Sequence, residues 1–427
     1  MVLRYQKTNL INAVAVTLSF VLSFSSATLL SVWLIGISLI LLISEKVKGA
    51  LKALALIQVR SLISSGIAVE MSSASGVKWM CLFLLSFYII FSSFSALNAT
   101  MNKIISWIAL FFVYICVTSL LISSYPVVAI AKAISYFVPF VAILCGTYAT
   151  RDFDWIGYYN KILGSVLLIS AVLLPFPVGY LRNGHAFQGA INHPNMYGIM
   201  LAVFLAGYLY KIKEKLGFAD ILVVCSVFFL IFQSESRTSL ISAVAVVMIS
   251  FAFSKINIAF KAIIIFFGIS FILISFELPF FDSLTDFIYK GHDDIWYSRS
   301  ELLENNMSRF YDNPIFGTGF NVPYESGVQS FEFSFDMPVE NGNIFTALLG
   351  DLGIVGTTLF IICYGSILKK GNKKALVLFV IPFIISMGEM VFFSSNNCAL
   401  ILYTYFAVYL SSRYDVDDKM INKKVGV

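Results

Sequence analysis

Long runs of apolar residues constrain the fold of this chain more than any other feature. The 427 residues are 59% hydrophobic and only 12% charged, whereas about 25% charged residues is usual in soluble domains. A soluble fold of this composition would expose large apolar patches, and the 41 Phe and 21 Tyr exclude a disordered chain. A membrane-spanning helix needs roughly 20 apolar residues. The sequence therefore predicts an all-α polytopic membrane protein.

Thirteen segments are apolar and long enough to be candidate spans. They are 10–25, 27–44, 78–97, 102–124, 126–147, 155–177, 195–211, 218–233, 237–254, 257–276, 343–368, 374–392 and 397–411. Residues 49–71 are a further apolar segment, although they include Lys52 and Arg60. This segment either supplies another crossing or lies in the membrane interface as an amphipathic helix. We therefore expect 12–14 transmembrane helices.

Basic residues gather in three places that the predicted crossings put on one side of the membrane. They are Lys211, Lys213 and Lys215, then Lys369, Lys370, Lys373 and Lys374, and finally Arg413, Lys419, Lys423 and Lys424. Short loops rich in Lys and Arg remain in the cytoplasm. We therefore expect the loops 177–195 and 277–342 on the opposite, non-cytoplasmic side. The net charge of +5 is too unevenly placed to predict a nucleic-acid partner.

Three parts follow from this pattern. Residues 1–276 hold the transmembrane helices up to about the tenth, including the short outer loop 177–195. Residues 277–342 form a long loop with 12 of the 24 acidic residues, and loops of this length are usually functional. We expect short helices in it, one of them from Ser298 to just before Pro314. Residues 343–427 hold the last three helices and the tail.

Two polar clusters on the non-cytoplasmic side are candidates for chemistry. Residues 233–239, with Arg237, join two apolar spans. They are either an ordinary polar turn with a Ser or Thr helix cap, or a site where the guanidinium grips phosphate. The short loop holds Arg182, His185, His193 and Asn195. Ionisable groups near the membrane often mark function.

A metal site is the less favoured interpretation of the histidines. His292, Asp293 and Asp294 lie together in the long loop, but no tight metal-ligand spacing is present. The segment N-P-I-F-G-T-G (313–319) lacks the third glycine of a nucleotide-binding loop and predicts a tight turn. We expect neither a metal nor a cofactor.

Five motifs occur in a fixed order between about Tyr180 and Leu368. They are R-x-G (Arg182, Gly184), H-P-N (193–195), S-x-S-R (Ser234, Ser236, Arg237), N-P-I-F-G-T-G (313–319) and N-x-F-x-x-x-L-x-D-x-G-x-x-G (343–356). Their order and their placement on one side of the membrane resemble the superfamily of O-antigen ligases and Wzy-type O-antigen polymerases. The resemblance implies a bacterial inner-membrane protein whose active site faces the periplasm. It also implies glycan transfer from an undecaprenyl-diphosphate-linked donor within membrane lipid, with a chain-length regulator protein as a possible partner.

The resemblance assigns roles to individual residues. Arg182 and Arg237 would clamp the diphosphate, Arg299 would support them, and pre-placed guanidinium donors can stabilise a diphosphate leaving group without a metal. Asn195 and Asn343 belong to the matching motifs, and we assign them to substrate binding as well.

A departure from the ligase pattern bears on the choice between the related activities. Ligases of this superfamily usually carry a His immediately before the Asn that opens the late helix, but here that residue is Gly342. The departure favours a polymerase, with Glu340 as the base for the acceptor hydroxyl and His185 and His193 as rivals. A ligase that transfers the glycan to a lipid A core is the close alternative. A lipid-linked oligosaccharide flippase is more distant, because transporters usually show internal repeats, and none is visible here.

Overall fold

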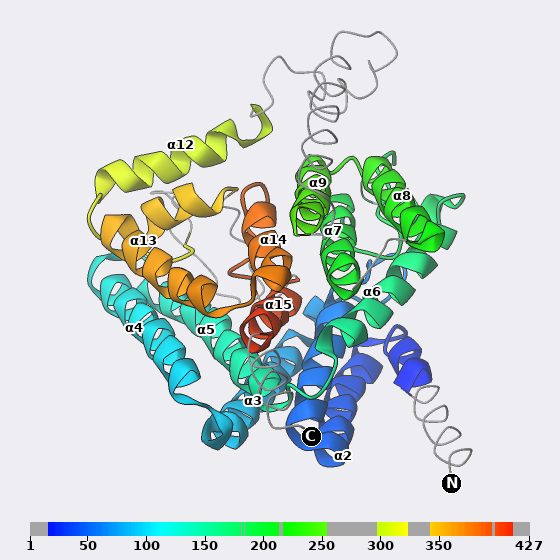
Figure 1. The fold of residues 1–427 in the computed structure, drawn as a ribbon, viewed down its shortest axis with the longest axis horizontal. Helices are drawn as coiled ribbons and strands as arrows, with labels where there is room; N and C mark the ends of the chain where they lie inside the picture. Colours follow the sequence, from blue (N-terminus) through cyan, green and yellow to red (C-terminus); the bar gives the residue numbers. More distant parts are fainter. Residues whose placement is uncertain are drawn as a thin grey trace, which may run out of the picture.

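The computed structural model is built from helices packed side by side (Figure 1). It describes residues 16–180, 182, 184–212, 217–253, 297–322, 342–394 and 398–412. The helices are α2 (Ala27–Ser61), α3 (Ser75–Ser93), α4 (Ala99–Ile122), α5 (Pro126–Ala149), α6 (Trp155–Val172), α7 (Pro194–Lys211), α8 (Phe218–Gln233), α9 (Arg237–Ala252), α12 (Tyr297–Asp312), α13 (Ile344–Lys370), α14 (Leu376–Ser386) and α15 (Ala399–Ser411). Six elements within the described residues are long and apolar enough to cross a membrane. The predicted class, an all-α polytopic membrane protein, is confirmed.

The helix α2 is a hairpin of two antiparallel arms. The backbone reverses at Lys46, whose φ is 53°. Lys52 Nζ lies 2.6 Å from Glu45 Oε2, whereas seven residues of straight helix span about 10.5 Å. A Cβ on Gly49 would overlap the Leu41 carbonyl, so only glycine allows the arms to approach this closely.

The burial of the returning arm, residues 47–61, bears on the choice between a crossing and an interfacial helix. Most of its side chains are buried, which is unlike an interfacial helix with one polar face. Its last turn reaches the residues that precede α2, because Arg60 donates to Ser23 Oγ (3.0 Å) and to the Ser23 carbonyl (3.1 Å). Arg60 Nη2 also donates to the Val69 carbonyl in the loop after α2 (2.6 Å). The first part of the segment 49–71 is therefore an inner helix of the bundle, which favours a crossing over an interfacial helix.

The two ends of the bundle differ in charge. We call the end with His193, Arg237 and Asn343 the arginine end, because α7, α9 and α13 all begin there. The opposite end, where α7 and α13 finish at Lys211 and Lys370, is the lysine end. There Lys211 Nζ pairs with Asp154 Oδ2 at 2.6 Å.

The helix α13 is broken within its first half. Gly353 has φ 64° and ψ −168°, so the carbonyls of Gly350 and Asp351 cannot accept from the N–H groups four residues later. Residues 313–319 supply the missing partners. The N–H groups of residues 318 and 319 donate to these carbonyls (both 3.0 Å), and the carbonyls of residues 314 and 315 accept from N–H 354 and 355 (2.9 and 3.2 Å). The N-P-I-F-G-T-G segment is thus a tight turn that repairs a helix break.

The expected span 374–392 is wrong at its C-terminal end. α14 stops at Ser386, and residues 387–394 form turns before α15. A Cβ on Gly388 would overlap the side chain of Thr238, so the chain after α14 packs directly against the start of α9. The early end of α14 brings a polar residue, Glu389, to the arginine end.

Candidate functional site

The turn between α8 and α9 packs closely on α7. Its residues include Glu235, with φ 52°, and Ser236 as the N-cap of α9. A Cβ on Gly198 of α7 would lie within 2.7–2.9 Å of atoms of Ser234, Ser236 and Ser239. The small side chains on both partners therefore let α7 and α9 approach, which brings the start of α7 beside Arg237.

The short loop 177–193 is tied to the bundle through Gln188. This side chain is only 1% exposed. Its Oε1 accepts from the Arg182 N–H (3.0 Å), and its Nε2 donates to the Ile191 carbonyl (3.0 Å) within the loop. Nε2 also donates to Ser64 Oγ (3.3 Å), in the segment after α2. The loop also joins the α8–α9 turn, because the Phe187 N–H donates to the Gln233 carbonyl (2.8 Å).

Three residues named from the sequence lie in or beside this loop. His185 Nδ1 is 3.0 Å from Glu235 Oε1, and the His185 side chain is 66% exposed. His193 is the N-cap of α7, and its Nδ1 accepts from the Asn195 N–H (3.1 Å). Arg182 is exposed, and its guanidinium makes no ion pair with any residue that the structure describes.

Glu389 connects the remaining predicted residues, and the sequence analysis missed it. Its Oε1 accepts from Asn195 Nδ2 (2.9 Å), and the same oxygen pairs with Arg299 Nη2. Asn343, the N-cap of α13, donates from Nδ2 to the Met387 carbonyl (3.0 Å). Residues 387–389 thus collect polar side chains from α7, α12 and α13.

Two arginines lie near each other at the arginine end. The charge of Arg299 acts unfavourably on Arg237, and Arg299 pairs with the Glu389 carboxylate. The N-termini of α7, α9 and α13 also meet here, and each carries a partial positive charge. Among the described residues, the two guanidinium groups and the three helix N-termini lie near Glu389 and near Glu235, which pairs with His185. Guanidinium groups and helix N-termini both bind anions.

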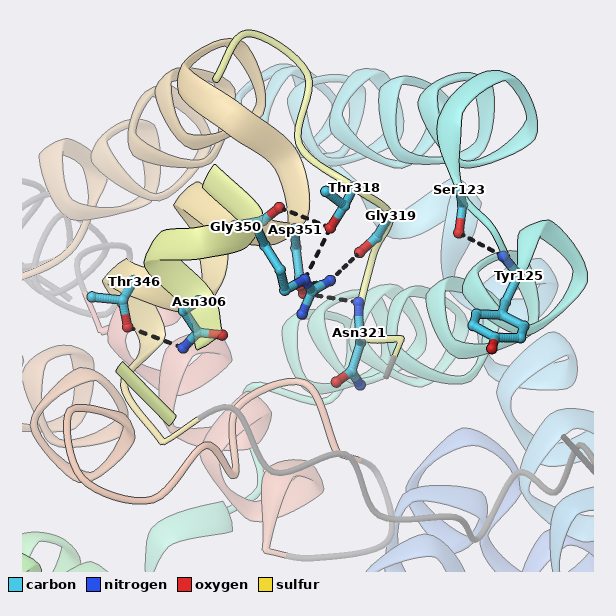
Figure 2. Close-up of polar contacts among 10 residues, drawn as sticks. Ser123, Tyr125, Asn306, Thr318, Gly319, Asn321, Thr346, Gly350 and Asp351 are labelled. Atoms are coloured by element: carbon cyan, nitrogen blue, oxygen red, sulfur yellow. Dashed lines mark hydrogen bonds and ion pairs between the residues drawn. The ribbon is translucent and has the colours of Figure 1, made fainter. Parts of the chain in front are cut away.

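A second arginine of α12 has a different surrounding. Arg309 and Asp351 form an ion pair in which the side chains are 2% and 3% exposed. Arg309 also donates to Thr318 Oγ1 and to the Gly319 carbonyl (both 2.9 Å), and the contacts of this cluster are drawn in Figure 2. This arginine holds the structure together and is not placed to meet a ligand.

Some predicted residues cannot be placed. Glu340, the predicted base, and the group His292, Asp293 and Asp294 lie outside the described residues. The roles assigned to the three arginines, the two asparagines and the two other histidines stay predictions. The structure brings Asn195, Arg237, Arg299 and Asn343 to one end of the bundle.

Residues 221–361 match the protein-family model described as O-antigen ligase. The matched segment runs from α8 into the second half of α13, so it includes Arg237, Arg299 and Asn343. No match was found among curated proteins. The family match confirms the resemblance to the O-antigen ligase and polymerase superfamily, and it supports a function of the ligase or polymerase type.

Proposed function

We propose that this protein is a membrane glycosyltransferase that polymerises oligosaccharide repeat units carried on undecaprenyl diphosphate. The observation that carries the proposal is the meeting of Arg237 and Arg299 with three helix N-termini at one end of an apolar bundle. A lipid-linked diphosphate has the two properties that this end suits, an anionic head and an apolar chain. The family match supports a reaction of the ligase or polymerase type.

The reaction breaks the bond between the anomeric carbon and the diphosphate oxygen. The diphosphate leaves with the electron pair, and a hydroxyl of the acceptor forms the new glycosidic bond while a base takes its proton. Negative charge grows on the leaving group, and donors already in place stabilise it most effectively. Arg237 and Arg299 would supply these donors, with Arg182 as a third from the short loop.

Glu389 would orient the clamp. One carboxylate oxygen holds Arg299 from α12 and Asn195 from α7, so the two side chains keep a fixed spacing before the donor binds. Arranged donors stabilise a developing charge without the cost of reorganisation during the reaction.

The proposal places the site in the periplasm of a bacterium with the protein in the inner membrane. Lys211, Lys370 and Lys373 lie at the lysine end, and an excess of basic residues marks the cytoplasmic side. The arginine end would then face the periplasm, where the glycan of the donor is located. A chain-length regulator remains a proposed partner on this side.

The choice of polymerase over ligase rests on Gly342, which stands where ligases of the superfamily usually carry a His. Deletion of the gene tests this choice through the pattern of surface glycan on a gel. We expect the deletion strain to carry single repeat units on the lipid acceptor, and the wild-type gene to restore long chains. Complete loss of glycan from the lipid acceptor would instead identify a ligase.

Removal of the Glu389 charge should weaken the clamp. Glu389→Gln keeps an oxygen that can accept from Asn195 but loses the attraction for Arg299. A hydrogen bond to a charged group contributes about 1.5–3 kcal/mol, so we expect kcat/KM to fall roughly tenfold to a hundredfold in a purified transfer assay. Glu70→Gln is the matched control, because Glu70 is exposed in the described loop after α2. Unchanged kinetics in Glu389→Gln would show that Arg299 needs no carboxylate to hold it.

A further inference from the structure

One stripe of α12 faces α13. Arg299, Leu302, Asn306 and Arg309 follow one another at spacings of three, four and three residues, which places them on the same side of a helix. Contacts confirm the placement along the stripe. A Cβ on Gly342 would lie 3.3 Å from Leu302, and Asn306 Nδ2 donates to Thr346 Oγ1 (3.2 Å). The stripe therefore has Arg299 at one end and Arg309 at the other.

The Arg309 end of the stripe is fixed from several directions. Besides its ion pair with Asp351, Arg309 is bonded to two residues of the turn that repairs α13. Asp351 in turn accepts from the Asn321 N–H through Oδ2 (2.8 Å). Figure 2 shows Thr318, Gly319, Asn321 and Asp351 close together, between the turn and the broken part of α13.

Glycine makes this joint tight. A Cβ on Gly350 would lie 2.7 Å from the Asn306 carbonyl and 3.3 Å from Arg309 Cβ, so α12 and α13 touch here through their backbones. Any slide of α12 along α13 would separate Arg309 from Asp351 inside a buried space, where an unpaired charge is strongly unfavourable. The ion pair therefore sets the axial position of α12.

We propose that the Arg309–Asp351 ion pair is a positioning device for the transfer reaction: it fixes α12 on α13 and so holds the Arg299 guanidinium against Glu389 beside Arg237. This inference rests on the proposed function, in which Arg299 contacts the diphosphate. Arg309 and Asp351 act through α12 across about 15 Å of helix and do not touch the substrate themselves. Of the two arginines on α12, Arg299 is the one that would contact the diphosphate.

A double-mutant cycle separates positioning from general stability. We expect Asp351→Asn alone to lower kcat/KM for the lipid-linked donor about tenfold to a hundredfold. In an Arg299→Ala background the same change should cost less than about threefold, because the group that it positions is already gone. An equal loss in both backgrounds would overturn the proposal, since a purely structural role costs the same with or without Arg299.

The Lys211–Asp154 pair at the lysine end provides the matched control. Asp154→Asn also removes a carboxylate from an ion pair, but far from α12. We expect it to change kcat/KM by less than about twofold in either background. A loss as large as that of Asp351→Asn would count against a specific role for the buried pair.

A distance measurement tests the same inference without requiring any transfer activity. Spin labels on Cys at Asn305, exposed on α12, and at Ser65, exposed in the loop after α2, report the position of α12 in a chain whose exposed Cys225 is replaced by Ser. We expect Asp351→Asn, or Arg309→Lys if the first variant does not fold, to shift or broaden the distance distribution by pulsed EPR. An unchanged distribution in a folded variant would overturn the positioning role. A shifted distribution in a protein without transfer activity would instead reject the proposed function alone.

Discussion

Arg237→Ala should abolish nearly all glycan transfer, while Arg237→Lys should keep only a small part of it. Alanine removes both the charge and the paired donors of a guanidinium, whereas lysine keeps the charge as a single point and loses the fork that matches a phosphate. Two hydrogen bonds to a charged group at about 1.5–3 kcal/mol each correspond to a loss on the order of 10²–10⁴-fold for alanine. For lysine, which loses one of the two bonds, we expect roughly a tenfold to hundredfold loss in kcat/KM.

Two measurements make this result interpretable. The amount of each variant in the membrane shows whether the protein still folds, because Arg237 is also the first residue of α9. Arg151→Ala is the matched control, since Arg151 is exposed in the turn after α5, next to the Tyr148 ring. If both Arg237 variants polymerise normally at normal protein levels, Arg237 does not bind the donor and only begins α9 after an ordinary polar turn.

The fold class could be predicted from the sequence because composition alone decides it. The number of crossings could not, and α2 shows why. The returning arm carries Lys52 and Arg60, which lower the hydropathy of the segment to that of an interfacial helix. In the structure Glu45 forms an ion pair with Lys52, and Arg60 donates hydrogen bonds to Ser23 Oγ and to the Val69 carbonyl. These contacts form only when the arms fold back on each other, so they cannot be predicted from the local sequence.

Some residues of the candidate site could be predicted from the sequence, and one could not. Arg237, Asn195 and Asn343 stand out because each begins a helix or a polar turn between apolar segments. Glu389 was missed because it lies inside the segment 374–392, which the sequence analysis assigned to a span. A signal was present, since an acidic residue within an apolar segment is costly and tends to mark function. What could not be predicted is that α14 ends early and delivers this carboxylate to Arg299.

The base that accepts the proton of the acceptor hydroxyl has three candidates, and their surroundings differ. His193 Nδ1 accepts from the Asn195 N–H, so the lone pair of the neutral ring is already used at the start of α7. His185 Nδ1 faces the Glu235 carboxylate. An ionised carboxylate only accepts hydrogen bonds, so this contact places the ring hydrogen on Nδ1 and the lone pair of the neutral ring on Nε2. Glu340 keeps first place among the three because it is three residues before Asn343, near the position of the His in related ligases.

Glu340→Gln should therefore lower the transfer rate by about 10²–10⁴-fold, the usual contribution of proton transfer to a positioned base. Glutamine keeps the shape and the hydrogen bonds of glutamate but cannot take up a proton. The KM for the lipid-linked donor should change little, because Arg237 and Arg299 are untouched, and the loss should fall on kcat. Glu332→Gln, in the same acidic loop, is the matched control and should remain active. Full turnover in Glu340→Gln would contradict the assignment. His185→Gln would then be the next variant to measure, ahead of His193, because His193 Nδ1 already accepts a hydrogen bond from the Asn195 N–H.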